Sequence, residues 1–472
     1  MSAAKRIKAG EKMDRASLNM TEGSILKNLI YFAIPILIGN IFQQLYNVAD
    51  TAVIGNILGD NALAAVGAAA PVYNLLIGFA GGLTNGFAVI IARYFGASDK
   101  CGMKRSVAIT YMLSAVIAVV ITIGSIAVLD PLMRALKTPD EIISDTESYM
   151  CIIMLFSAVT VAYNMLAGMM RAIGNSKTPL YFLIVSTFVN IGLDFLFVQA
   201  FDMGVAGAAY ATVISQGVSV VLCFIYALKK CRSLIFERAE FVWDKAMFAD
   251  IAVTGLSMGL MYAIVSVGSV ILQGAVNSFG TNTITAHTAA RKIDDIFMLP
   301  LGTVSMAAST FASQNYGAGK IDRVKKGIRY GIVISLAWSI VSMLICVPFC
   351  APFVHLLTGT TDEAVITAAS KYIVWNIPFF PILSVLLVLR SSLQGVGRKL
   401  VPVSGSIIEL FLKILAVAVL APNFGYWGIC ISEPIIWIVC AAVVVVDYTV
   451  FVRQTAQNKL IIGETATLKT DI

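Results

Sequence analysis

Residues 94–105 read YFGASDKCGMKR, and residues 315–326 read NYGAGKIDRVKK. Each stretch has an aromatic residue, Gly and Ala directly after an apolar run, and each ends on two basic residues. The Gly-Ala step falls at Gly96 in the first stretch and at Gly317 in the second. A shared motif at a fixed offset predicts that the chain contains an internal repeat.

Three further pairs of motifs keep the same offset or nearly so. They recur at the same points of a six-segment cycle, which a chance match would not do. The pairs are Phe201–Gly207 with Pro422–Gly428, Ile173–Gly174 with Val396–Gly397, and Gly59 with Gly280.

The composition is typical of an integral membrane protein. The chain of 472 residues is 58% hydrophobic and 13% charged, roughly half of the ~25% charged residues usual in soluble domains. Its mean hydropathy is +0.85, and many apolar runs exceed the ~18 residues that begin to suggest a membrane span. These values exclude a soluble enzyme, a disordered chain and a disulfide-stapled secreted domain, and they predict an integral membrane protein.

Twelve apolar segments are predicted to cross the bilayer as helices, because each covers the ~30 Å hydrocarbon layer at ~1.5 Å per residue. The predicted fold is an all-α integral membrane protein with two six-helix lobes. Since six is even, both halves enter the membrane from the same side, and a parallel pseudo-two-fold repeat relates them. The predicted spans are residues 28–52, 64–91, 106–129, 147–170, 179–201, 205–228, 249–276, 284–312, 328–352, 371–393, 402–421 and 427–451.

Basic residues alternate between the two sides of these spans. The two tails and the loops on one side hold 27 of the 34 lysines and arginines, whereas the six other loops hold three. The excess of positive charge predicts that both termini are cytoplasmic and that the protein lies in the inner (plasma) membrane. The basic side includes Lys5, Arg6, Lys8, Lys12, Arg15 and Arg238, and the other side includes Arg134 and Lys137.

The predicted domain organisation follows from the spans and the repeat. Residues 1–25 and 452–472 form cytoplasmic tails. Residues 26–228 form the N-lobe and residues 249–451 the C-lobe. Residues 229–248 form a basic cytoplasmic linker between the lobes.

Four polar residues of the N-lobe form the predicted ion-coupling site: Asp50, Asn190, Asp194 and Thr212. A charge in hydrocarbon costs at least ~2.5–3.5 kcal/mol, so each acid there needs a reason. Asn190 precedes Asp194 by four residues, which puts both on one helix face. Two carboxyl groups in one apolar pocket repel each other, so the pair is expected to take up a proton or a small cation such as Na⁺. The alternative is that each acid caps a helix or lies at the membrane interface.

Other residues of the N-lobe are assigned supporting roles. Gln44 and Asn47 share a span with the first acid and are expected to border the ion site. Pro35 interrupts the hydrogen-bond ladder of the same span, so a bend there could respond to the charge of that acid. Tyr46 and Tyr73 are expected to form adaptable apolar walls, or simply to pack helices together.

The C-lobe does not repeat the acidic pocket. The repeat offsets align Asp50 with Ile271, and Asp194 with Val417. Span 11 instead carries an acid and a base at i,i+4, a spacing suited to an internal, structural ion pair. The opposite charges of span 8 are expected to neutralise one another or to line a cavity. The predicted C-lobe polar cluster comprises Arg291, Asp294, Asp295, Glu409, Lys413 and Glu433.

The spans, the repeat and several motifs together resemble one known family. The motifs are Pro35 to Gly55, Gly59 to Ala65, Met170 to Pro179, and Gln314 to Gly319. Over roughly residues 20–450 the chain resembles the multidrug and toxic compound extrusion (MATE) transporters, and among them the prokaryotic DNA-damage-inducible (DinF-like) branch. The resemblance implies an antiporter for drugs and organic cations that needs no cofactor and is driven by protons or sodium.

The resemblance also implies roles for individual residues. The four predicted ion-coupling residues match the first-lobe ion site of that branch, and Tyr149 and Asn164 resemble its neighbouring positions. Another branch carries acids for sodium in spans 7 and 10, where this chain has Ile264 and Gln394. This departure favours the first-lobe site.

The predicted function is secondary active efflux of amphipathic or cationic organic compounds in exchange for H⁺ or Na⁺, by alternating access between the lobes. A lipid-linked oligosaccharide flippase is the alternative; Arg291, Lys292 and Lys413 keep it open, and the N-lobe acids oppose it. The loops are too short for the effector domain of a receptor, and no catalytic motif predicts an enzyme. The expected partners are small organic substrates and the bilayer, with no nucleic acid, and the chain is expected to act as a monomer.

Overall fold

The structure is a computed structural model that describes residues 17–135, 139–236 and 243–470. The predicted basic residues up to Arg15, and also Lys137 and Arg238, lie outside these ranges. Within them the chain is almost entirely helical and contains no strand, which confirms the all-α prediction.

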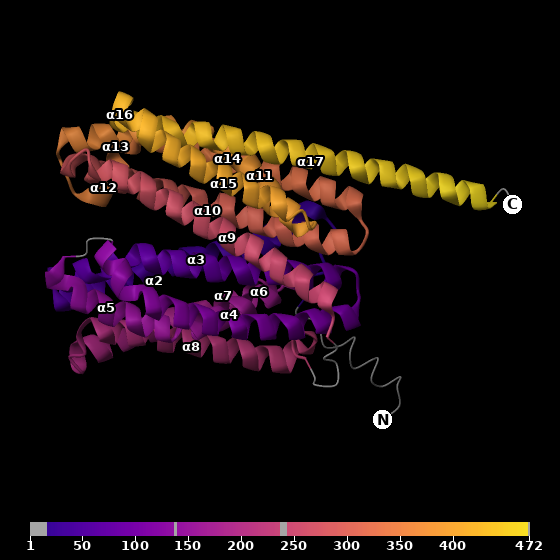
Figure 1. The fold of residues 1–472 in the computed structure, drawn as a ribbon, viewed down its shortest axis with the longest axis horizontal. Helices are drawn as coiled ribbons and strands as arrows, with labels where there is room; N and C mark the ends of the chain where they lie inside the picture. Colours follow the sequence, from indigo (N-terminus) through magenta and orange to yellow (C-terminus); the bar gives the residue numbers. More distant parts are fainter. Residues whose placement is uncertain (1–16, 136–138, 237–242, 471–472) are drawn as a thin grey trace. The chain divides into compact units, whose positions relative to one another are not determined.

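Eleven helices of the described chain are long and apolar enough to cross a membrane, or twelve if one bent pair counts as a single span (Figure 1). This agrees with the predicted number. The bent pair is α5 (Asp140–Leu155) and α6 (Ser157–Ala172). In the first half the other helices are α2 (Ile25–Leu58), α3 (Asp60–Gly96), α4 (Lys100–Ala135), α7 (Lys177–Asp194) with the π segment η1 (Phe195–Ala200), α8 (Gly204–Lys230) and the short η2 (Arg232–Leu234). In the second half they are α9 (Lys245–Asn277), α10 (Thr281–Gly317), α11 (Ile321–Cys346), α12 (Cys350–Thr358), α13 (Glu363–Asn376), η4 (Ile377–Phe379), α14 (Phe380–Gly395), α15 (Leu400–Leu415), η5 (Ala416–Leu420), α16 (Ala421–Phe424) and α17 (Tyr426–Thr470).

Three predicted segments differ from the helices. The span predicted over 147–170 is broken at Phe156, where the chain bends by 49°. The span predicted to reach residue 352 ends as a regular helix at Cys346, and the short helix α12 begins at Cys350. The last helix was predicted to end before a tail at residue 452, but α17 continues to Thr470.

The repeat is visible in the backbone as well as in the sequence. Helices α3 and α10 each have 37 residues, and their first residues lie at the offset of the sequence motifs. Each follows a glycine with positive φ, 84° at Gly59 and 90° at Gly280. The turns that end these helices also match, because the N–H of Ser98 donates to the carbonyl of Phe95 at 3.0 Å, and the N–H of Gly319 to that of Tyr316 at 3.0 Å. The two-fold internal repeat is therefore confirmed.

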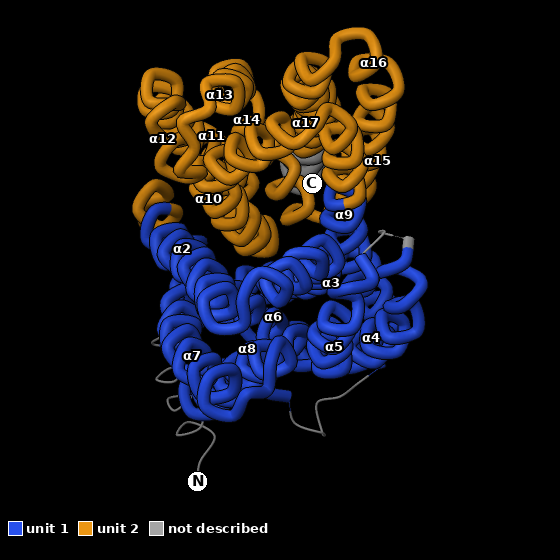
Figure 2. The backbone as a smooth tube through the Cα atoms, turned by 90° about the vertical axis from the view of Figure 1, so that its left-hand side faces the viewer, with its two compact units in different colours: residues 1–22, 30–266 blue, residues 23–29, 267–472 orange. Residues whose placement is uncertain are grey.

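The chain divides into two compact units, which Figure 2 colours separately. Unit 1 comprises residues 1–22 and 30–266, and unit 2 comprises residues 23–29 and 267–472. The division falls inside α2 and inside α9, so residues 25–29 of α2 belong to unit 2 and residues 245–266 of α9 belong to unit 1. The predicted boundaries of the lobes and the linker were drawn from the sequence repeat and not from compact units. They stay a prediction.

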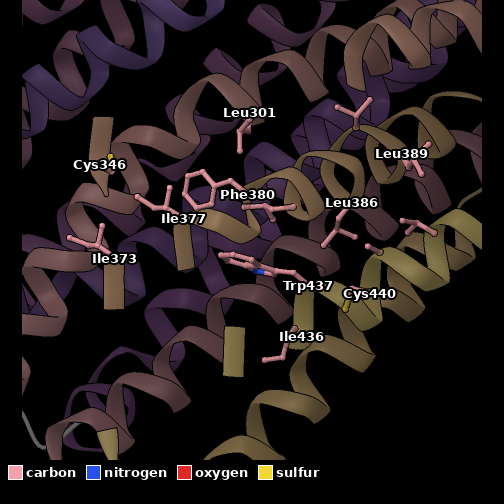
Figure 3. Close-up of a cluster of buried hydrophobic side chains, with 14 of the residues drawn as sticks. Leu301, Cys346, Ile373, Ile377, Phe380, Leu386, Leu389, Ile436, Trp437 and Cys440 are labelled. Atoms are coloured by element: carbon pink, nitrogen blue, oxygen red, sulfur yellow. The ribbon is translucent and has the colours of Figure 1, made fainter. Parts of the chain in front are cut away.

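The core of unit 2 gathers aromatic and aliphatic side chains from α10, α13, α14 and α17 (Figure 3). Phe380 is fully buried and its ring contacts that of Trp437, with the centroids 6.1 Å apart. Lipid tails are as apolar as leucine, so a core inside a membrane is stabilised by the fit of its side chains rather than by removal from water.

Helices α3 and α9 cross at close range within unit 1 because glycines face each other. Helix α3 carries Gly82 and Gly86, and α9 carries Gly255 and Gly259, with the members of each pair four residues apart. A Cβ added at Gly86 would lie 2.5 Å from the Cα of Gly255. Small residues at this spacing let two backbones approach closely in a bilayer.

Gly86→Ala should therefore destabilise the protein, because the added methyl group would overlap α9. Overpacking of this kind costs about 1–3 kcal/mol, so the thermal unfolding temperature in detergent should fall. Gly67→Ala on the same helix is the matched control, since nothing lies within 4 Å of an added Cβ there. Equal unfolding temperatures for the two variants would contradict the close crossing.

Candidate functional site

Two acids of the N-lobe lie together inside unit 1. Asp50 in α2 is 7% exposed, and Asp194 at the end of α7 is fully buried. Their carboxyl groups interact directly with each other. Within the described chain, Oδ1 of Asp50 and both carboxylate oxygens of Asp194 receive no hydrogen bond, and no lysine or arginine forms an ion pair with either acid.

Three tyrosines surround this acid pair. The hydroxyl groups of Tyr46, Tyr73 and Tyr149 all lie within electrostatic range of Asp50. The Tyr46 hydroxyl donates to Oγ1 of Thr212 at 3.0 Å, so Thr212 joins the pocket through this tyrosine. Tyr46 and Tyr73 were expected to be apolar walls; their hydroxyl groups make them part of the polar site instead.

The local structure explains how the pair is presented. Tyr46 precedes Asp50 by one helical turn, which places both side chains on one face of α2. Asp194 is the last residue of α7 before the π segment η1. Asn190 lies one turn earlier on the same face and is fully buried, with neither side-chain atom hydrogen-bonded in the described chain. Single π turns inside helices are frequent at functional sites.

A second hydrogen-bonded group extends the site away from the acids. Gln216 interacts with Tyr73 through its side chain and accepts a hydrogen bond from Thr160 Oγ1 at 2.8 Å. The sequence analysis did not identify Gln216 or Thr160. The spacing does carry a signal for Gln216, because it follows Thr212 by one helical turn on α8. Thr160 lies on α6, and no spacing along one helix could connect it to Gln216.

Not every predicted neighbour reaches the acid pair. Gln44 and Asn47 are exposed, and the Asn47 amide donates to the Gln44 side chain at 3.3 Å rather than to an acid. Asn47 precedes Asp50 by three residues on α2, and the assignment of Gln44 and Asn47 as ion-site neighbours stays a prediction. Asn164 is half-buried and donates to the Thr160 carbonyl at 2.9 Å.

Tyr149 and Pro35 are the remaining predicted residues of the N-lobe. Tyr149 is 5% exposed and interacts with both acids, so the structure does bring it into the pocket. Pro35 is buried within α2, which is continuous over Ile25–Leu58. Its role as a hinge stays a prediction.

The charges of the C-lobe cluster pair with one another inside unit 2. Arg291 lies 2.9 Å from a carboxylate oxygen of Glu433 and 3.6 Å from one of Asp295, and it donates to the Tyr372 hydroxyl at 3.3 Å. Arg291, Asp295 and Glu433 border a cavity of about 190 Å³ that His287 also lines. Arg291 therefore acts as the counter-charge of two acids.

The pair predicted in span 11 also forms, within a larger group. Lys413 Nζ lies 3.1 Å from Glu409, as their spacing predicts, and Arg390 lies 3.4 Å from the same carboxylate. Arg390 was not anticipated as a partner. Asp294 is the exception in this lobe: it is fully buried, neither of its carboxylate oxygens is hydrogen-bonded within the described residues, and Arg291 is the cation that acts on it.

The buried acids of the two units thus differ in whether basic residues lie beside them. In unit 2, Asp295, Glu409 and Glu433 each form an ion pair with a basic group, and Asp294 has Arg291 only at longer range. In unit 1, Asp50 and Asp194 have each other and a ring of hydroxyl groups. Among the described residues, no group of three or more His, Cys, Asp or Glu side chains is arranged to hold a metal ion.

A model of the MatE family matches two segments of the chain, residues 35–196 and 258–419. The two segments are equally long, and their offset is that of the motifs at Ile173 and Val396, so each match falls on one repeat. The two segments together cover more than half of the chain.

Similar proteins are known from bacteria. The probable multidrug resistance protein YpnP of Bacillus subtilis (strain 168) is 28% identical over 383 residues, which are 81% of this chain and 85% of that protein. The probable multidrug resistance protein YoeA of the same organism is 31% identical over 317 residues, 66% of this chain and 68% of that protein. A solved outward-facing structure of a multidrug resistance MATE family transporter superimposes with a TM-score of 0.84 at 23% identity and covers 94% of this chain and 99% of its own. At that identity the structural likeness bears on the fold alone.

Glu409→Gln should destabilise unit 2 strongly, because Arg390 and Lys413 would be left as two neighbouring cations without a counter-charge. The side chains of these three residues are 6–11% exposed, and removal of one partner from a buried pair costs about 3–5 kcal/mol. Thermal unfolding in detergent measures the loss. Combining Glu409→Gln with Lys413→Met should recover part of it, and a single variant as stable as the wild type would refute the structural role of the pair.

Proposed function

We propose that this chain, which belongs to the MatE family, exports small organic compounds across the cell membrane in exchange for H⁺ or Na⁺. Relatives named as probable multidrug resistance proteins support this class of substrate. Helices that can cross a bilayer support the membrane setting. A member of this family is a transporter and not an enzyme.

The proposed coupling of export to an ion rests on one observation. Asp50 and Asp194 lie together without an ion pair to any lysine or arginine of the described chain. Two carboxylates this close repel each other in a low-dielectric pocket, and uptake of one positive charge removes the repulsion. A proton shared between Asp50 and Asp194 would do so. Na⁺ would do so as well, with the oxygens of Asn190 and Thr212 completing its ligands, since hard cations favour oxygen.

Ion binding would drive transport by changing which state of the protein is stable. A ligand shifts an equilibrium only by its differential affinity for the two states. In the proposed cycle, an ion enters the acid pocket from outside, the helices that carry the acids repack, and the substrate's affinity falls so that it leaves. The binding sites then open to the cytoplasm instead of to the outside. The ion departs on the cytoplasmic side, and a new substrate binds.

The charges of unit 2 do not favour the flippase alternative. A cavity that holds a pyrophosphate needs an excess of unneutralised positive charge. Arg291 is already paired with Glu433 and Asp295, and Lys413 with Glu409. Of the three basic residues, Lys292 is left without an ion pair in the described chain, and one lysine is not such an excess. Competition between a lipophilic cation and a lipid-linked sugar for the purified protein would distinguish the two substrates.

The remaining parts of the proposal concern the cellular setting. We place the protein in the plasma membrane with both termini in the cytoplasm, because the basic residues gather on that side of the predicted spans. The DNA-damage-inducible branch is proposed from the residues of the ion site. A monomer suffices for the cycle, since each chain contains both repeats.

Asp50→Asn should fold but lose ion-driven efflux, because the amide cannot take up a proton and offers no charge to Na⁺. We expect a loss of at least about tenfold in the initial rate of export of a lipophilic cation from proteoliposomes, equivalent to ~1.4 kcal/mol or more of lost coupling. Asp145→Asn is the matched control: its carboxyl group is exposed on α5, and its rate should equal that of the wild type.

The coupling ion is identified by imposing pH and sodium gradients independently on the same proteoliposomes. Export driven by the pH gradient alone identifies H⁺, and export driven by the sodium gradient alone identifies Na⁺. Full gradient-driven export by Asp50→Asn would refute the assignment of the acid pair. Export that needs neither gradient would refute antiport itself.

A further inference from the structure

We propose that the cavity between the start of α2 and the first turns of α11 binds the headgroup of an anionic phospholipid. The cavity has a volume of about 630 Å³ and lies wholly within unit 2. Its position at the predicted cytoplasmic ends of both helices places it at the level of lipid headgroups. Its lining residues are Gly23, Ser24, Ile25, Leu26, Arg323, Lys326, Arg329, Tyr330 and Val333.

The charge of the cavity is one-sided. Three of the lining residues are basic, Arg323, Lys326 and Arg329, and none is acidic. Lys326 and Arg329 are exposed, and neither forms an ion pair with an acid of the described chain. Basic groups gathered this way at a membrane surface attract the phosphates of anionic lipids.

Arg323 is held in place at the wall of the cavity. Its Nη1 donates to the carbonyl oxygen of Gly23 at 3.0 Å, and its Nε donates to the Asn315 side chain at 3.0 Å. The first bond joins the residues just before α2 to the first turn of α11, and the second holds the same arginine against the end of α10. The cavity is therefore formed by anchored backbone and not by surface side chains alone.

The lining of α11 changes from basic to apolar along one face of the helix. Arg323, Lys326, Tyr330 and Val333 follow one another at spacings of three and four residues, so their side chains point the same way. The stretch from Arg323 to Val333 spans about 15 Å. A phospholipid has the same order, with a charged phosphate followed by an apolar chain.

The apolar part of the cavity favours a lipid over a soluble anion. Leu26, Tyr330 and Val333 are 39%, 42% and 61% exposed. A free phosphate ion would contact the basic residues and leave these side chains without a partner. A lipid would contact both parts, and a tyrosine at the border between them is typical of the membrane interface.

The basic cluster is not a by-product of the internal repeat. At the offset that aligns Gly96 with Gly317, the positions of Arg323 and Arg329 correspond to Gly102 and Ala108, and only Lys326 keeps a basic counterpart. Ala108 is buried. The other repeat therefore has no such cluster at the same place, which separates this site from the general excess of positive charge in the loops.

Bound lipid would join α11 to the helix that carries the ion site. Residues 25–29 of α2 belong to unit 2, whereas the part of α2 with Asp50 belongs to unit 1. A lipid held by the first turn of α2 would thus act on this helix near the point where its packing partner changes.

The test compares lipids and variants by thermal unfolding of the purified full-length protein in detergent. Phosphatidylglycerol should raise the unfolding temperature of the wild type, and phosphatidylcholine should not. Lys326→Gln combined with Arg329→Gln should weaken the apparent affinity for phosphatidylglycerol by about 30-fold, from ~1 kcal/mol for each basic group. Lys229→Gln combined with Lys230→Gln is the matched control, because it removes the same charge from an exposed helix end outside the cavity.

Three results would overturn the proposal. An unchanged affinity in the Lys326/Arg329 variant would mean that the cavity is not the site. An equal loss in the Lys229/Lys230 control would mean that only net charge matters. Stabilisation of the wild type by inorganic phosphate equal to that by phosphatidylglycerol would identify a soluble anion instead. If the double variant does not fold, the single Lys326→Gln variant, whose side chain is exposed, should show about a fivefold loss, and a normal affinity there would equally refute the site.

Discussion

A charged side chain within the hydrocarbon layer is stable only if an opposite charge, a bound ion or a proton neutralises it, and the two repeats meet this constraint in different ways. In unit 2, Glu409 lies between Arg390 and Lys413, and Arg291 lies between two acids. Such groups are neutralised permanently by the chain itself. In unit 1 no basic group of the described chain forms an ion pair with Asp50 or Asp194, and under the proposed function a proton or a cation neutralises them. Under that proposal, one half of the duplicated fold has charges that stabilise it, and the other half has charges that respond to an ion.

The duplicated backbone makes this contrast visible position by position. The repeat offsets align Thr212 with Glu433, Tyr149 with Tyr372, and Tyr73 with Asp294. Each member of the first set borders the acid pair, and each member of the second borders Arg291. The same three places on the helices therefore surround a polar centre in both units. The side-chain chemistry is kept at the tyrosine pair and differs at the other two places, because backbone geometry constrains turns and helix ends far more than it constrains a residue in a pocket.

Local sequence signals predict the helices but not their interruptions. Apolar runs identified the spans because a helix in lipid must be apolar over most of its length. The break at Phe156 escaped detection, since the residues on either side are as apolar as those of any span and contain no proline or glycine at the bend. In contrast, Gly59 and Gly280 could be recognised, because a positive φ strongly favours glycine and leaves a trace in the sequence.

The sequence by itself determined the class of protein, the number of spans, the repeat, and the two acids that face each other, because charges in apolar runs are rare and spacing along a helix fixes a face. Only the tertiary structure decided which other side chains reach those acids. Tyr46 and Asn47 are neighbours in the chain, yet the hydroxyl of Tyr46 lies at the acid pocket and the amide of Asn47 is exposed. A helix turns by about 100° per residue, so adjacent residues face different surroundings, and only the packing of α2 against its neighbours selects the face that meets α7 and α8.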